Sequence, residues 1–210
     1  VVSELTVRAS NWPAVVTAST AEVELRNCQI TSSSRSGVEV LGQSRLTLTQ
    51  SEVSGCGENG VSVSENGTLV ADETAVKENS RGHGVCLSSS EPCILRRCSI
   101  LSNGRNGVVV MGPKQGSVET DQPLVTFELN VLAFNRAYGL AVHSGAKVLW
   151  QAGEVHDNAM GDCQGKKTVI GWVMAPKRRQ RGGRGDRAAD GEGDDRTPGG
   201  RNAAAPTNGR

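Results

Sequence analysis

The residues with the greatest potential for chemistry lie around one histidine. His83 stands between two glycines in Gly82-His83-Gly84, and carboxylates precede it at Glu52, Asp72 and Glu73. Two carboxyl groups on either side of a glycosidic bond, one donating and one accepting a proton, would hydrolyse a polysaccharide. Asp72 and Glu73 are consecutive, so in an extended chain they point to opposite faces and cannot form such a pair. The sequence therefore predicts no catalytic residues and a protein that is not an enzyme.

A second group of potential ligands lies close to residue 160. His156 and Asp157 are followed by Asp162 and Cys163. This spacing matches none of the usual ligand sets for Zn²⁺ or Ca²⁺. We therefore expect a polar turn at this place, with no metal ion, and we expect no cofactor elsewhere in the chain.

These residues must be positioned by a short pattern that recurs along the chain, a glycine followed by alternating apolar residues. Its copies are Gly37-Val38-Glu39-Val40, Gly60-Val61-Ser62-Val63, Gly84-Val85-Cys86-Leu87, Gly107-Val108-Val109-Val110 and Gly139-Leu140-Ala141-Val142. With a degenerate copy that starts at Ala14, the steps between copies are 23, 23, 24, 23 and 32 residues. A fixed period of this size indicates stacked structural repeats.

Each repeat contains three short runs of alternating apolar residues, as in Val61/Val63, Leu69/Ala71 and Thr74/Val76. Such alternation is typical of strands with one buried face. Three short strands per turn describe an all-β fold, a single-stranded parallel β-helix of about six 23-residue coils, in which equivalent strands stack about 4.8 Å apart. The aromatic residues Phe127 and Trp150 fall at inward positions. The leucine spacing and Asn or Cys ladder of a leucine-rich repeat are not visible, nor are the hexapeptides of a left-handed β-helix.

The turn before the first run of each repeat is rich in glycine and asparagine, as in Asn103-Gly104-Arg105-Asn106-Gly107. Both residues tolerate a left-handed backbone, so we expect these glycines to be structural and to supply that conformation at a corner. We also expect Asn side chains to bond the backbone of the neighbouring coil. A phosphate-binding loop is not indicated, because no helix follows the turn.

Six cysteines are spread through the chain without any CxxC pair: Cys28, Cys56, Cys86, Cys93, Cys98 and Cys163. They occupy positions that small apolar residues take in other repeats. This placement favours buried or half-buried free thiols in a reducing compartment. Disulfide bonds or a metal site are the alternatives.

One turn is nine residues longer than its counterparts. The run at Val125/Phe127 begins 18 positions after Gly107 rather than nine, and the extra residues lie within 112–123. Because the core pattern resumes in register, the insertion must protrude, and loops on a rigid scaffold often carry contacts. Of the two interpretations, we favour a tolerated insertion, and a contact loop is the alternative. The candidate binding residues of this loop are Lys114, Gln115, Glu119 and Asp121.

The outward positions of the second run become apolar along the chain, at Val70, Ile94 and Leu149. An exposed apolar stripe usually marks a contact surface, so these three are also candidate binding residues. The apolar segment 169–174 could instead fold back over the stripe or close the end of the coil stack. Of these possibilities we expect the terminal segment to cover the stripe.

The composition changes near residue 175. Residues 177–210 contain no Val, Ile, Leu, Phe, Trp or Tyr, and nine basic against five acidic side chains give them a net charge of +4. Such a segment cannot bury enough apolar surface to order itself. We expect a β-helix domain at 1–174, with coils to about 163 and a terminal cap or cover segment at 165–174. Residues 175–210 are expected to be a disordered low-complexity tail.

Composition also limits the partners. With +1 for the whole chain, the body carries about −3 and does not favour nucleic acid, except weakly through the Arg-Gly segment of the tail at 181–185. No apolar run of 18 residues is present, so no membrane span is predicted. The chain begins at Val1 inside a strand-like pattern, so we expect it to be a fragment of a longer protein.

The repeats, as in Gly37 to Val40 through Asn135 to Val142, resemble the right-handed parallel β-helix repeat family over roughly residues 5–163. Gly82-His83-Gly84 separately resembles a motif of the polygalacturonase-like hydrolases in that architecture, but their accompanying acidic elements are missing. The short coils and free cysteines are most similar to the intracellular eukaryotic group, which includes the β-helix F-box proteins and the SHC-binding protein family. That resemblance implies right-handed coiling and a non-enzymatic recognition module.

Two functions remain open at this point. The first is a non-catalytic module for protein–protein recognition or scaffolding in the cytoplasm or nucleus, with recognition of a substrate for another enzyme as one such role. The second is a carbohydrate-active or sugar-binding β-helix whose site lies partly outside this chain. Fold alone decides neither, because one architecture hosts many functions.

Overall fold

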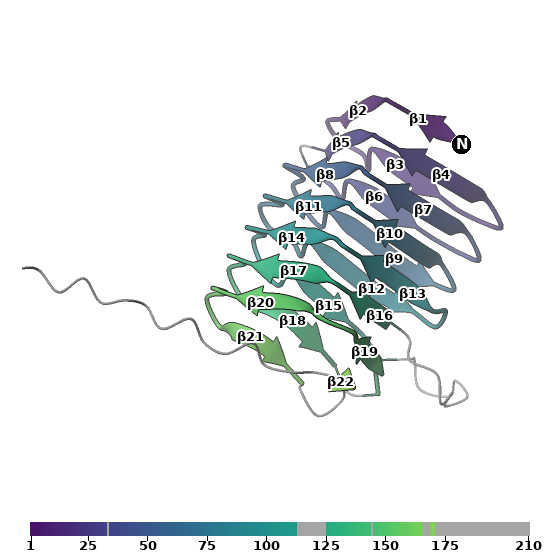
Figure 1. The fold of residues 1–210 in the computed structure, drawn as a ribbon. Coiled ribbons are helices and arrows are strands. Elements are labelled where there is room, and N and C mark those ends of the chain that lie inside the picture. Colours follow the sequence, from purple (N-terminus) through teal and green to yellow (C-terminus); the bar gives the residue numbers. More distant parts are fainter. Residues whose placement is uncertain (33, 113–124, 144, 166–168, 171–210) are drawn as a thin grey trace, which may run out of the picture. The chain divides into compact units, whose positions relative to one another are not determined.

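The fold is built only from short strands wound into a rod. The computed structural model describes residues 1–32, 34–112, 125–143, 145–165 and 169–170, and all of their regular elements are strands in three parallel sheets. Consecutive strands of the chain go to different sheets, and each coil returns to the first sheet one strand further along (Figure 1). None of the described residues forms a helix of the length and apolarity needed to cross a membrane.

The three sheets contain eight, seven and seven strands. Sheet A consists of β1 (Val2–Ser3), β4 (Glu22–Arg26), β7 (Arg45–Thr49), β10 (Thr68–Asp72), β13 (Cys93–Arg96), β16 (Val125–Glu128), β19 (Val148–Trp150) and β22 (Val169–Ile170). Sheet B consists of β2 (Thr6–Ala9), β5 (Gln29–Ser32), β8 (Glu52–Ser54), β11 (Ala75–Lys77), β14 (Ser99–Leu101), β17 (Asn130–Ala133) and β20 (Gly153–His156). Sheet C consists of β3 (Val15–Thr17), β6 (Val38–Val40), β9 (Val61–Glu65), β12 (Val85–Ser89), β15 (Val108–Val110), β18 (Tyr138–Val142) and β21 (Gly161–Gln164).

The register of the strands confirms the sequence repeat. Val61, Val85, Val108 and Leu140, each the first residue after a repeat glycine, pair in succession across sheet C. Taken in the order C, A, B, the strands from β3 to β20 make six complete coils, the number that the sequence predicts. In sheets of this kind the rest of each coil connects parallel neighbours, which otherwise need a helical crossover.

The insertion before β16 leaves the core register intact. Phe127 pairs with Leu95 on one side and with Trp150 on the other, although the chain between β15 and β16 is nine residues longer than in the other coils. The predicted contact residues Lys114, Gln115, Glu119 and Asp121 lie outside the described residues.

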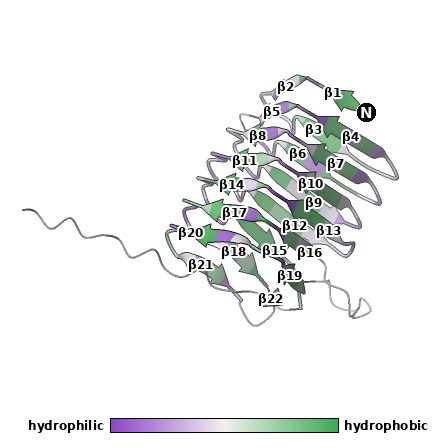
Figure 2. Cartoon of the chain, in the orientation of Figure 1, coloured by the Kyte–Doolittle hydropathy of each residue, from purple (hydrophilic) through white to green (hydrophobic). Residues whose placement is uncertain are grey.

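Alternation places one face of the strands inside the rod, except in β1 at the start of the chain, where both residues are exposed. The interior is a single column of Val, Leu, Ile and Cys side chains, and Phe127 and Trp150 are both buried as predicted, with stacked rings 5.3 Å apart. Figure 2 shows more hydrophobic colour in later strands such as β15, β17 and β19 than in β4 and β5, because outward positions also become apolar there.

The segment expected to cover the outer stripe begins by lengthening sheet A instead. Val169 and Ile170 form β22, which pairs in parallel with β19 through Val148 and Leu149. Val169 is buried because it continues the inward row of Val148. The expectation of a cover is therefore wrong for these two residues, and 171–174 lie outside the described residues. The chain divides into two units, Val1–Ala175 and Pro176–Arg210. The second unit, which corresponds to the predicted tail, lies outside the described residues.

Candidate functional site

The corners of the rod, where strands change sheet, hold the residues with potential chemistry. At the two corners that flank the sheet B strands, most coils have a residue with a left-handed backbone. Between sheets A and B these residues are Glu4, Asn27, Gln50, Glu73, Arg97, Leu129 and Ala152. Between sheets B and C they are Gly55, Glu78, Ser102, Phe134 and Asp157.

The repeat glycines do not supply that conformation, so the reason expected for them is wrong. Gly37, Gly60, Gly84, Gly107 and Gly139 have no positive φ. At each of them an added Cβ would lie within 3.0 Å of atoms of the neighbouring coil. These glycines are structural because the coils approach one another too closely at this corner for any side chain.

Four buried asparagines form a ladder beside these glycines. Asn79, Asn103, Asn135 and Asn158 follow sheet B strands in successive coils, and each Nδ2 of the first three donates to the next Oδ1 at 2.8–2.9 Å. Each Oδ1 also accepts the backbone N–H of the preceding coil, beginning with Cys56. No Asn ladder is visible in the sequence, and this counted against a leucine-rich repeat; that part of the inference is wrong. The ladder was missed in the sequence because its asparagines are separated by unequal steps of 24, 32 and 23 residues.

His83 belongs to a second ladder, at the start of the sheet C strands. Its backbone N–H donates to Asn59 Oδ1 at 2.9 Å, and its Nδ1 accepts the backbone N–H of Asn106 at 3.3 Å. Asn106 Oδ1 in turn accepts the backbone N–H of Tyr138. His83 thus takes the place of an asparagine, and its Nδ1 lone pair is already used, which leaves Nε2 to carry the proton of the neutral ring.

The ladder makes the protonation of His83 unfavourable. Burial, and then the positive charges of Arg105 and His143, lower the pKa of His83 from 6.5 to about 4. The unfolded chain binds this proton near pH 6.5, so stability is complete above that pH and is lost as the pH falls toward 4. Solvent screens the exposed part of the ring, so we expect a loss of about 1–2 kcal/mol between pH 7.5 and 5. Urea unfolding at the two pH values measures it.

The matched control is His83→Asn, because Asn59 and Asn106 already hold the flanking ladder positions. This variant should keep the ladder and lose the extra pH dependence, while the carboxylates titrate as in the wild type. Equal pH dependence of the two proteins would show that His83 is not the responsible group.

The three carboxylates considered for catalysis are all bound to cations. Lys77 donates to Glu52 at 2.9 Å and thereby lowers the pKa of that carboxyl. Arg97 donates through Nη2 to Asp72 at 2.6 Å and through Nε to Glu73 at 3.1 Å. The inference that Asp72 and Glu73 diverge is wrong, because the left-handed backbone of Glu73 turns both carboxylates toward one guanidinium.

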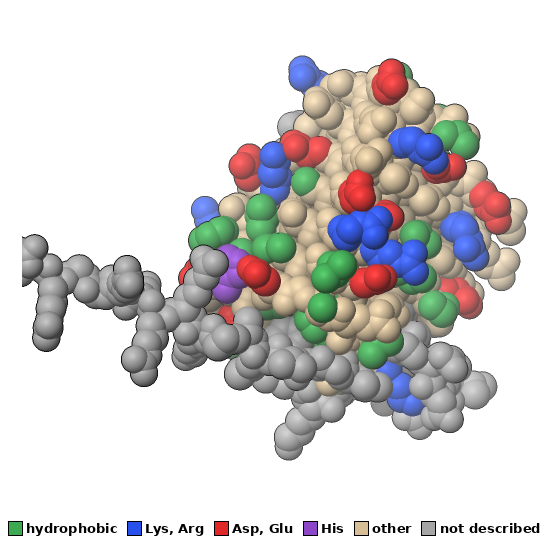
Figure 3. Space-filling view, viewed as in Figure 1, with side chains coloured by type: hydrophobic (Ala, Val, Ile, Leu, Met, Phe, Trp, Pro, Cys, Tyr) green, Lys and Arg blue, Asp and Glu red, His purple; other side chains and the backbone are tan. Residues whose placement is uncertain are grey.

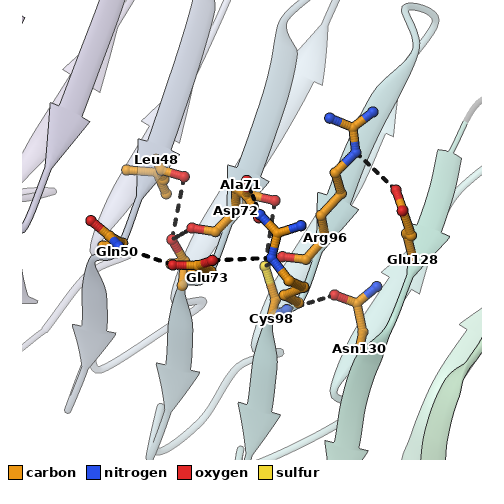
Figure 4. A network of polar contacts seen from close by, with 11 residues as sticks. Leu48, Gln50, Ala71, Asp72, Glu73, Arg96, Cys98, Glu128 and Asn130 are labelled. Atoms are coloured by element: carbon orange, nitrogen blue, oxygen red, sulfur yellow. Dashed lines mark hydrogen bonds and ion pairs between the residues drawn. The ribbon is translucent and has the colours of Figure 1, made fainter.

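Figure 4 shows this cluster along the A–B corner. Gln50 donates to Glu73 at 3.0 Å, and Arg96 pairs with Glu128 at 3.0 Å in the next coils. Asp72 Oδ1 is the one buried side-chain polar atom without a hydrogen-bond partner among the described residues. The arrangement crosslinks adjacent coils. Within this cluster, no two carboxylates face each other as the proton donor and proton acceptor of a hydrolase would.

The possible metal ligands near residue 160 are only partly brought together. His156 Nδ1 lies 2.8 Å from Asp157 Oδ2, and His156 Nε2 lies 3.7 Å from Glu154 Oε2. Cys163 is buried in β21 of sheet C, where it pairs with Leu140 in the inward row. Among the described residues there is no group of three or more His, Cys, Asp or Glu side chains that could hold a metal ion.

All six cysteines are free thiols, as predicted. Five are buried, and Cys86 is half-buried on the outer side of β12. Burial raises the pKa of Cys93 and of Cys98 to about 11. A thiol with such a pKa stays protonated at neutral pH and is a poor nucleophile.

The structure brings part of the predicted apolar stripe together. Val70 and Ile94 are direct neighbours in β10 and β13, and Leu149 follows two strands further on, after Thr126. All three apolar side chains are half-buried on the outer side of sheet A.

Sequence reasoning missed two more exposed apolar side chains. Leu129 and Phe134, at the two ends of β17, are 54% and 58% exposed. The signal was present in the sequence, since aligned corners would have shown apolar residues where other coils carry polar ones, but strand alternation does not extend to corners.

Comparison with protein-family models finds one match, described as a right-handed β-helix region, over residues 13–169. The match covers the six complete coils and most of the 210 residues. No curated protein and no solved structure compared with the chain matches it significantly.

Proposed function

Because this chain belongs to the right-handed β-helix family, we propose that it is a non-catalytic recognition module that binds a protein partner along the side of its rod. The observation that carries the proposal is the pairing of Val70 with Ile94 on the outer side of sheet A. Half-buried apolar side chains in register on a rigid sheet suit a contact surface. The insertion at 112–123, which the sequence predicts to protrude, is a second candidate contact.

The state of the ionisable groups supports binding rather than turnover. Glu52, Asp72 and Glu73 each bind a cation, and His83 uses its Nδ1 to hold the neighbouring coil. Glycoside hydrolysis needs one carboxyl free to give a proton and another free to take one. The carbohydrate-active alternative therefore finds no favourable observation among the described residues.

The compartment and subgroup are part of the proposal. Six free thiols suit the reducing cytoplasm or nucleus. On the resemblance noted above, we place the module with the intracellular eukaryotic group that includes β-helix F-box proteins and the SHC-binding family. Selection of a substrate for a separate enzyme is the role that this grouping favours.

A capture experiment tests the function. The wild-type chain and a Val70→Asn/Ile94→Asn variant would be immobilised, and the proteins retained by each would be quantified by mass spectrometry. We expect at least one protein to be retained by the wild type and reduced tenfold or more on the variant, because polar outward side chains remove the apolar contact.

Two further samples sharpen the result. A chain lacking 112–123 reports on the loop. Thr47→Asn, in the same row of sheet A, is the matched control because it exchanges one polar outward residue for another. Proteins retained equally by all variants would contradict the proposal. Cleavage of a plant or bacterial polysaccharide by the wild-type chain would favour the carbohydrate-active alternative instead.

A further inference from the structure

Strand β17 carries a large apolar residue at each end, on the outside of the rod. Leu129 precedes it with φ 56° and Phe134 follows it with φ 59°. Both side chains are more than half exposed. The other left-handed residues at these two corners are polar, apart from the small residues Gly55 and Ala152. Among the described residues, only the coil of β17 therefore has large apolar side chains at these positions.

The two side chains are unfavourable for the fold itself. A left-handed backbone is disfavoured for bulky residues and is tolerated best by Gly, Asn and Asp. Exposure of large apolar groups to water is a further penalty. Neither residue belongs to the core, and Phe134 meets the His156 ring edge-on, with centroids 5.8 Å apart. Strain combined with exposure points to a contact outside the chain.

The outward residues of β17 between these two, Val131 and Ala133, are apolar and uncharged. Val131 and Leu101 point outward from β17 and β14, and their partners across the two strands are Ser99 and Ala133. Figure 3 shows hydrophobic side chains gathered over β14 and β17, next to a histidine. We call Leu101, Leu129, Val131 and Phe134 the β17 patch.

Two exposed carboxylates border the β17 patch on the side of β20, where His156 lies against both. Glu154 is paired in register with Val131 on the next strand, and Asp157 follows β20; both side chains are exposed. Arg97 holds Asp72 and Glu73, and Lys77 holds Glu52, whereas Arg136, two residues after Phe134, is exposed. A partner would therefore meet apolar anchors with carboxylates beside them.

We propose that the β17 patch docks a segment of a partner protein that carries two apolar anchors and at least one Lys or Arg. Leu129 and Phe134 are five residues apart, about 16 Å along an extended strand. Anchors at that distance fit an extended segment of about five residues or a helix of about eleven. The proposal rests on the recognition function proposed above and places its contact on sheet B rather than on the sheet A stripe.

Selection from a phage-displayed library of random 16-residue peptides on the full chain tests the site. We expect the selected peptides to be rich in apolar residues and Lys or Arg. Their affinity should fall at least tenfold for Leu129→Asn/Phe134→Asn, and several-fold for Glu154→Gln/Asp157→Asn or in high salt. Val16→Asn is the matched control, since Val16 is 52% exposed on the outer side of sheet C, and it should leave binding unchanged.

Unfolding in urea separates a binding role from a structural one. Leu129→Asn and Phe134→Asn should unfold at the same or a higher urea concentration than the wild type, because asparagine adopts the left-handed backbone more readily. A midpoint clearly lowered by either substitution would show that the side chains serve the fold and would overturn the proposal.

The binding results also separate this proposal from the proposed function. Peptides could bind the Leu129→Asn/Phe134→Asn variant with unchanged affinity but lose affinity for Val70→Asn/Ile94→Asn. That result would overturn the placement on sheet B and leave the recognition function intact. Selected peptides rich in Asp and Glu would overturn the assigned partner chemistry. Failure to select any peptide would contradict both.

Discussion

Replacement of Gly84 by alanine is expected to lower the free energy of unfolding by about 3 kcal/mol. An added Cβ would lie 2.5 Å from Ile100 Cγ2, 2.6 Å from the carbonyl oxygen of Gly107 and 2.7 Å from Asn103 Nδ2. Two of these atoms belong to backbone and ladder groups of the next coil, so a side-chain rotation cannot relieve the conflict. The coils would have to separate locally, and several parallel hydrogen bonds would weaken. Urea unfolding followed by circular dichroism measures the change.

Gly55→Asn is the matched control for this substitution. Gly55 has φ 64° and nothing within 4 Å of an added Cβ, and asparagine tolerates a left-handed backbone. The control should therefore change the unfolding midpoint little. If Gly84→Ala were as stable as Gly55→Asn, close approach of the coils would not be the reason for the repeat glycine.

Removal of one rung of the buried ladder is the second large effect. Asn103 is fully buried, donates from Nδ2 to Asn135 Oδ1 and to the Val76 carbonyl, and accepts from the backbone and side chain of Asn79. Asn103→Ala would leave several of these groups buried without partners, and each such group costs about 1–3 kcal/mol. We expect a loss on the order of 3 kcal/mol in urea unfolding, since some groups regain partners by relaxation.

Asn66→Ala serves as the control, because Asn66 is exposed in the turn between β9 and β10. Its effect should stay within about 0.5 kcal/mol. Gly84→Ala combined with Asn103→Ala should cost less than the sum of the two, because the second change removes an atom that the new methyl group would meet. A strictly additive double variant would contradict the proposed contact between these two positions.

Much of the fold could be predicted because its signals are local and repeated. Alternating apolar residues such as Val61 and Val63 determine which side of a strand is buried, and the 23-residue period determines which strands become neighbours. Both features survive the long insertion, since Phe127 resumes the register. The outward placement of Val70, Ile94 and Leu149 followed from the same alternation, and so did the buried free cysteines.

The corners could not be predicted in this way, because their roles depend on atoms of other coils. Asp72 and Glu73 diverge in an extended chain, but a left-handed Glu73 directs both to Arg97, 24 residues after Glu73. His83 between two glycines suggested catalysis, whereas its position over Asn59 and under Asn106 makes it a ladder residue. The exposed pair Leu129 and Phe134 also lies at corners, where no period-2 pattern applies.

For this protein the sequence alone determined the architecture: strand alternation, the repeat length and the count of six coils. It did so because burial of one strand face is a property of neighbouring residues and needs no knowledge of distant ones. The tertiary structure alone decided why the glycines are present, which asparagines stack and which carboxylates are bound to cations. Those properties arise where coils about 4.8 Å apart bring together residues 23 to 32 positions apart in the chain, and only their stacking defines the space and the hydrogen-bond partners at each corner.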